Sequence, residues 1–114
     1  MTRAIERVEH CNSMEDVRRC IDALDDVLVP LLVTRGGYMT QAARIKGDVN
    51  LVRDEERIET IVQRVRERTA QEGGQPDVME AVYRELMEAC IAYEHREFAR
   101  LRGVGSEQSD GEQA

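Results

Sequence analysis

Apolar residues recur with a helical period from about residue 13 to residue 46. The positions on this face begin with Val17, Cys20, Ile21, Leu24, Val27, Leu28, Leu31 and Leu32. They return every three or four residues, which is the spacing of an amphipathic helix. Ser13 is followed by Asp16 three residues later, a pattern that resembles a capping box and predicts the helix start.

Pro30 and the pair Gly36-Gly37 oppose an unbroken helix. Pro30 removes a backbone donor in mid-helix, and the two glycines weaken the helical preference further. Two alternatives therefore stay open: one kinked helix from 13 to 46, or a break near residue 36. A continuous helix would be about 50 Å long at 1.5 Å per residue, and one small chain could not cover it.

A second helix follows the predicted loop from Gly47 to Arg53. Asp54 resembles an N-cap, and acidic residues follow it in the first turn, where the helix dipole favours them. The apolar stripe consists of Ile58, Ile61, Val62 and Val65. This helix is predicted to run to about Gln71, because Gly73 to Pro76 ends the pattern.

A third helix is predicted to reach about Leu101. Asp77 with Glu80 gives a second capping signal at its start. Its apolar face carries Met79, Val82, Tyr83, Leu86, Met87, Cys90, Ile91, Phe98 and Leu101, with Glu94 intruding. No segment has the pattern of a strand. We therefore expect an all-α fold with one long and two shorter helices, in which a partner chain buries the long one.

The chain is short enough for a single domain. We assign residues 1–12 to an N-terminal extension, 13–102 to the helical domain, and the polar segment 103–114 to a disordered tail. The first twelve residues lack the apolar core of a signal peptide. The longest apolar run, residues 27–33, is too short for a membrane span.

Composition narrows the class of partner. The 23 acidic residues outnumber the 16 basic ones, for a net charge of -7. This charge argues against non-specific binding to nucleic acid or to an anionic membrane. Cys11, Cys20 and Cys90 are odd in number and lack metal-binding spacing. They predict reduced, mostly buried thiols in a cytoplasmic protein without a metal site.

Four charged residues lie on or beside the apolar faces: Arg35, Lys46, Arg57 and Glu94. Each alone is explained by a side chain whose charged end reaches water. Glu94 is harder to explain, because a carboxyl among apolar residues must be paired or protonated. Several cations converging on one carboxyl suggest a pocket for a small anionic ligand. Arginine suits a carboxylate because its planar fork binds both oxygens.

Four segments carry a family resemblance. They read VRRCIDALDDVLVPLLVTR (17–35), ARIK (43–46), VRDEER (52–57) and LMEACIAYEH (86–95). Arg35 lies seventeen residues after Arg18, Lys46 follows eleven residues later, and Asp54 opens the next helix. This combination resembles the all-helical, type II chorismate mutases over about residues 14–101.

The resemblance implies a homodimer with intertwined long helices and two active sites, each built from both chains. The implied substrate is chorismate, a dianion of the shikimate pathway to aromatic amino acids, which rearranges to prephenate by a pericyclic shift. No cofactor is implied. Catalysis then consists of holding the reactive conformer and stabilising negative charge on the ether oxygen as its C–O bond breaks.

By position, the resemblance also implies roles. Arg18 of the partner chain and Arg35 of this chain would hold the carboxylates of the substrate. Lys46 would donate to the ether oxygen, Arg57 would support the substrate, and Asp54 would lie near the ring hydroxyl.

Three positions depart from the common pattern of the family. Cys90 replaces a serine that helps to hold a carboxylate. Glu94 replaces a glutamine donor, so it would have to be protonated to donate to the ether oxygen. Ile58 replaces a glutamate that binds the ring hydroxyl, and in this it resembles relatives that act on isochorismate or aminodeoxychorismate. An isochorismate pyruvate-lyase, an aminodeoxychorismate mutase and a non-catalytic helical dimer that binds a carboxylate ligand remain as alternatives.

Overall fold

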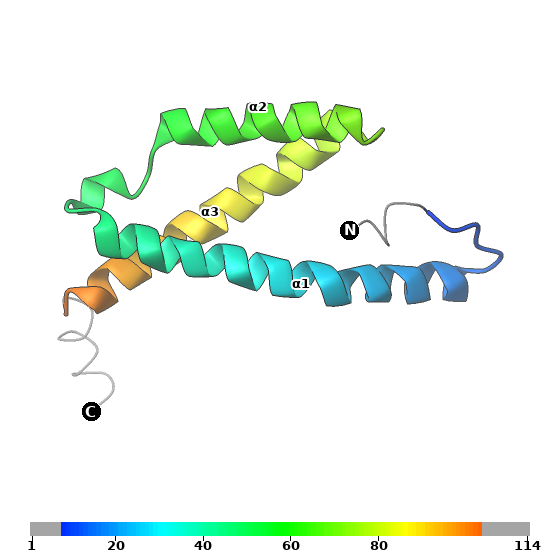
Figure 1. The fold of residues 1–114 in the computed structure, drawn as a ribbon, viewed down its shortest axis with the longest axis horizontal. Helices are drawn as coiled ribbons and strands as arrows, with labels where there is room; N and C mark the ends of the chain where they lie inside the picture. The colour runs from blue at the N-terminus through cyan, green and yellow to red at the C-terminus, as the bar shows by residue number, and fades with distance from the viewer. Residues whose placement is uncertain (1–7, 104–114) are drawn as a thin grey trace. The chain divides into compact units, whose positions relative to one another are not determined.

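The computed structural model describes residues 8–103, and this part of the chain is helical (Figure 1). In chain order its elements are α1 (Met14–Ile45), the short 3-10 helix η1 (Val49–Leu51), α2 (Glu55–Gln71) and α3 (Pro76–Leu101). The described residues contain no strand. The all-α prediction, with one long and two shorter helices, is thus confirmed. The predicted N-terminal extension and C-terminal tail fall largely on residues 1–7 and 104–114, which lie outside the described residues.

The predicted capping box starts α1. The Asp16 backbone N–H donates to Ser13 Oγ at 3.1 Å. In return, Asp16 Oδ2 accepts from the backbone N–H of Asn12 at 3.2 Å. These two bonds satisfy donors that the first turn of a helix leaves without a partner.

Of the two alternatives for the long helix, the continuous one is observed. The helix α1 has 32 residues and includes Pro30. Gly36 and Gly37 are α-helical, and a Cβ atom at either position would meet nothing within 4 Å. The helical tendency of the flanking residues therefore outweighs the cost of the proline and the two glycines. Ala43 is the one buried residue of α1.

The chain divides into two compact units, Met1–Arg35 and Gly36–Ala114. In the first unit, the apolar face predicted from the sequence is largely exposed. Its members Ile21, Leu24, Leu28 and Leu31 are 42–61% exposed. The chain itself therefore leaves uncovered the apolar surface that the sequence assigns to a partner.

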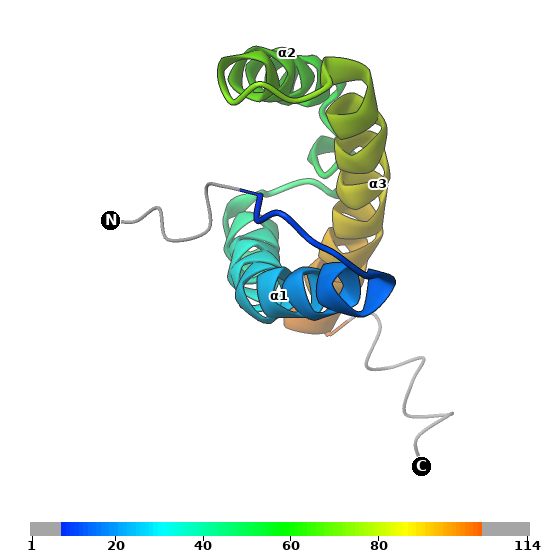
Figure 2. The same ribbon diagram turned by 90° about the vertical axis from the view of Figure 1, so that its right-hand side faces the viewer.

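In the second unit, α2 and α3 form an antiparallel helical hairpin (Figures 1 and 2). Gly73 in the connecting turn has a φ of 80°, a left-handed conformation that glycine adopts without a steric penalty. The core of the hairpin consists of Ile58, Val62 and Met87, against which Ile61, Tyr83 and Ile91 pack. This core is small, so other contacts must add to it.

Ion pairs from α2, and from Arg53 just before it, to α3 supply those contacts. Arginines on one side bind carboxylates on the other: Arg53 to Glu88 (2.7 Å), Arg84 to Glu59 (3.0 Å), and Arg66 to Asp77 (3.0 Å) and Glu80 (2.8 Å). Two of the pairs, Arg53–Glu88 and Arg84–Glu59, are bidentate. Hydrogen bonds from these guanidinium groups lower the pKa of Glu59, Glu80 and Glu88.

The predicted cap of the third helix is wrong. The helix begins at Pro76, and Gln75 is its N-cap residue without a side-chain hydrogen bond. Proline suits the first helical position because its missing N–H needs no partner there. Asp77 and Glu80 instead bind Arg66 of α2, a contact across the hairpin that local spacing does not reveal.

Polar side chains join the end of α1 to α3. Thr40 Oγ1 donates to Glu97 Oε1 at 2.9 Å. Arg100 Nε and Nη2 donate to the two oxygens of Glu97, each at 2.8 Å. The hydrogen bonds from Arg100 and then Thr40 lower the pKa of the buried Glu97 to about 2.

Glu97→Gln should lower the melting temperature at neutral pH by a few degrees. The depressed pKa means that Glu97 stabilises the folded state fully above its ordinary pKa of 4.5. This contribution is lost as pH falls from there towards about 2, so the two proteins should converge in acid. Thermal melts at pH 7, 4 and 2.5 test this, with the exposed Glu85→Gln as control. A difference that persists unchanged at pH 2.5 would contradict the assignment.

Candidate active site

Lys46 follows directly after α1, and both ends of the residue are held. Its backbone N–H donates to the carbonyl of Ala42 at 2.9 Å, which extends the helical bonding by one residue. Its ammonium group donates to the carbonyl of Val52 at 3.2 Å. The same Nζ lies 2.8 Å from Glu94 Oε2. The side chain is therefore directed inward, between η1 and α3.

Glu94 is the most buried charged side chain of this group, with 4% of its surface exposed. Its Oε2 is buried and, despite the short distance to Lys46, makes no hydrogen bond of acceptable angle. The contact between Lys46 and Glu94 is thus a short electrostatic contact rather than a hydrogen bond. A buried oxygen without a hydrogen-bond partner is costly, so this atom is available to a ligand that enters the pair.

Asp54 is the N-cap of α2, as the sequence predicts. Its Oδ1 accepts from the backbone N–H of Arg57 at 3.0 Å. Both side chains are exposed. The cap uses one carboxylate oxygen, so the other is available for a second hydrogen bond.

Ile58 and Cys90 differ in their surroundings. Ile58 is 8% exposed and belongs to the small core with Val62 and Met87. Cys90 is half-buried and lies one turn before Glu94 on the same face of α3. At position 58 the chain thus presents an apolar side chain that packs in the hairpin, with no polar group for a ring hydroxyl.

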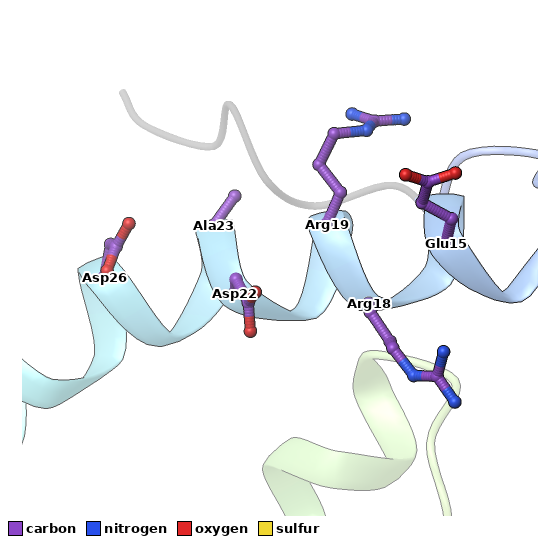
Figure 3. Close-up of a pocket in the computed structure, with 6 residues that line it drawn as sticks. All are labelled: Glu15, Arg18, Arg19, Asp22, Ala23 and Asp26. Atoms are coloured by element: carbon purple, nitrogen blue, oxygen red, sulfur yellow. The ribbon is translucent and has the colours of Figure 1, made fainter.

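Arg18 and Arg35 belong to the first unit, whereas the other six candidates belong to the second. Arg35 is half-buried, and Arg18 is exposed. Arg18 lines an open hollow of about 640 Å³ on α1, together with Glu15, Arg19, Asp22, Ala23 and Asp26 (Figure 3). Three carboxylates share this hollow with two guanidinium groups, so it does not by itself favour an anion.

The structure thus brings Lys46 to Glu94 and Asp54 to Arg57. Sequence reasoning missed the carbonyl of Val52 and the role of Arg102, which binds the end of α1. A main-chain acceptor leaves no signal in the sequence, and an arginine after a helix is common. In the described part, no group of three or more metal-binding side chains occurs, and no helix is long and apolar enough to cross a membrane.

Comparison with known proteins identifies the class. Residues 17–95 match the family model of chorismate mutase type II, a range that includes all eight candidate site residues. No curated protein matches the chain. The chain belongs to the type II chorismate mutase family, whose members are isomerases that convert chorismate to prephenate.

Proposed function

We propose that the chain acts as a chorismate mutase through a site centred on Lys46. The observation that carries the proposal is the buried pair of Lys46 and Glu94, with 2.8 Å between Nζ and Oε2. An ammonium has three N–H donors. Val52 accepts from one and Glu94 lies near a second, so the third is left for the ether oxygen of the substrate.

The catalytic effect expected of this arrangement is electrostatic. Negative charge develops on the ether oxygen as the C–O bond breaks, and a fixed ammonium stabilises that charge more in the transition state than in the substrate. Arg35 and Arg57 would hold the substrate, Asp54 would lie near the ring hydroxyl, and Cys90 would contact a carboxylate. In this scheme no covalent intermediate forms.

The proposed assembly is a homodimer in which Arg18 of one chain completes the site of the other. The exposed apolar residues of α1 support it, since they form a face that water does not favour. Arg18 is exposed on the same helix and available to a second copy. The described apolar surface includes Ile21, Leu24, Val27, Leu28, Leu31 and Tyr38, each at least 42% exposed.

A cytoplasmic location is part of the proposal. Cys11, Cys20 and Cys90 form no disulfide in the part of the chain that the structure describes, which supports a reducing compartment. The sequence predicts mostly buried thiols, and this prediction is wrong, because all three cysteines are half-buried.

Incubation of the protein with chorismate, isochorismate and aminodeoxychorismate in separate reactions tests the substrate. We expect prephenate from chorismate as the main product. Ile58 favours a second candidate function, in which the protein acts on isochorismate or aminodeoxychorismate. The reason is that its apolar side chain offers no hydrogen bond to the ring hydroxyl. Release of pyruvate from isochorismate at a higher rate than formation of prephenate from chorismate would favour an isochorismate pyruvate-lyase.

Glu94→Gln should flatten the pH dependence of turnover. A carboxylate has no proton to donate, so only protonated Glu94 would hydrogen-bond the ether oxygen. Wild-type kcat is therefore expected to fall as pH rises, whereas the kcat of Glu94→Gln should not, because glutamine donates throughout.

The matched control is Glu97→Gln, which changes another buried glutamate one turn further along α3. It should keep the wild-type pH profile, because Glu97 binds Arg100 and Thr40 instead of Lys46. If Glu94→Gln also keeps that profile, Glu94 is not the donor and Lys46 acts alone on the ether oxygen.

A further inference from the structure

Arg102 follows directly after α3 and touches the residue proposed to do the chemistry. Its Nη1 donates to the carbonyl of Ala43 at 2.9 Å, and its Nη2 donates to the carbonyl of Lys46. A longer bond of 3.4 Å joins Nη1 to the carbonyl of Phe98. The guanidinium also stacks on the ring of Phe98, with Cζ 3.6 Å from the ring centroid.

These contacts satisfy two helix ends at once. The last carbonyls of an α-helix lack intrahelical partners, and a cation at that end opposes the negative pole of the helix dipole. Ala43 and Lys46 lie at the end of α1, and Phe98 lies in the last turn of α3. The stacked ring fixes the plane of the guanidinium, so its two donors keep their directions.

Lys46 is consequently held from both sides. Arg102 binds its backbone carbonyl, while Val52 and Glu94 bind its ammonium group. Because α1 ends at Ile45, this contact anchors a residue that the helix itself no longer holds on its carbonyl side.

We infer that Arg102 is a positioning residue, which fixes the backbone of Lys46 so that the ammonium group meets the ether oxygen. The inference rests on the function proposed for Lys46. Arg102 lies beyond the range 17–95 that matches the family, so the match does not assign this role. A displacement of about 1 Å of a catalytic group can cost about a hundredfold in rate, which makes such anchoring consequential.

Arg102→Gln should lower kcat at least about tenfold and change KM less than about threefold, because the substrate-binding arginines are untouched. Arg102→Lys should give an intermediate kcat, since an ammonium reaches one carbonyl but does not form the planar fork. Arg96→Gln is the matched control: Arg96 is exposed on α3, the helix that Arg102 follows, and its Cζ lies 5.3 Å from the centroid of the Tyr93 ring. It should leave kcat unchanged.

Chemical rescue separates positioning from a general loss of structure. Millimolar guanidinium chloride should restore part of the kcat of Arg102→Ala, because the free cation can occupy the vacated place between the carbonyls of Ala43 and Lys46. Sodium chloride at the same ionic strength should not. Lys46→Ala should not respond to either salt.

The outcomes distinguish a failure of the function proposed for Lys46 from a failure of the positioning role of Arg102. If Lys46→Ala retains turnover, the proposed function fails. If Lys46→Ala is inactive but Arg102→Gln has normal kcat, the positioning role alone is overturned. Should Arg102→Gln fail to fold by circular dichroism, Arg102→Lys decides: a lowered kcat with normal KM supports the role, and wild-type kcat overturns it.

Discussion

Lys46→Ala is expected to lose about 10³-fold in kcat, which corresponds to about 4 kcal/mol in the activation barrier. The ammonium group is the cation nearest to the buried Glu94, at 2.8 Å from its Oε2. Alanine removes the cationic donor for the negative charge that develops on the ether oxygen. Steady-state kinetics on chorismate measure the loss, and a variant with near-normal turnover would rule out the mechanism.

The same substitution also leaves Glu94 buried without its cation, which costs folding free energy. Loss of activity and loss of stability therefore need separate tests. The double variant Lys46→Ala/Glu94→Gln removes the unpaired charge. It should recover much of the stability of wild type in thermal melts and none of its turnover. Recovery of turnover along with stability would mean that Lys46 serves the fold rather than the reaction.

Mixing two inactive variants should restore activity if the sites are shared between chains. In a hybrid of Arg18→Ala and Lys46→Ala, one site combines the intact Lys46 of one chain with the intact Arg18 of its partner. The other site carries both substitutions. Equal mixing with full subunit exchange gives hybrids in about half of the dimers, so about one quarter of wild-type activity should return.

A second mixture controls for this result. Lys46 and Glu94 form their pair within one chain, so each site takes both residues from the same protomer. A hybrid of Lys46→Ala and Glu94→Ala therefore has one defect in each site and should stay inactive. Activity in neither mixture, with hybrid dimers verified by mass, would mean that Arg18 acts within its own chain.

The helices could be predicted closely from the sequence because their signals are local. Ser13 and Asp54 act as caps, as predicted. The pattern along the sequence also predicts the residues at which α2 and α3 end, Gln71 and Leu101. The error at Asp77 has a physical cause. The Asp77 carboxylate can accept hydrogen bonds either from the nearby backbone or from Arg66. Only the folded hairpin brings Arg66 Nη1 to 3.0 Å from Asp77 Oδ1.

The candidate site likewise contains contacts that the sequence predicts and contacts that only the fold reveals. The intrusion of Glu94 into an apolar face predicts a partner for it, and the structure gives that partner as Lys46. The carbonyl of Val52 and the guanidinium of Arg102 depend on how the chain returns to itself, over 6 and 56 residues. A hydrogen bond to a main-chain oxygen leaves no trace in residue identity, so such contacts require the fold.

The ion pairs between α2 and α3 have a geometric consequence. They occur near both ends of the hairpin and in its middle, at Arg53–Glu88, Arg84–Glu59 and Arg66–Asp77. If one helix slid along the other by a single turn, about 5.4 Å, all three would break together. The buried side chains of Ile58, Val62 and Met87 oppose such sliding together with the paired charges, so both set the register of the hairpin. The fixed register keeps Glu94 of α3 at a constant position along the hairpin relative to Asp54 and Arg57, which lie at the start of α2.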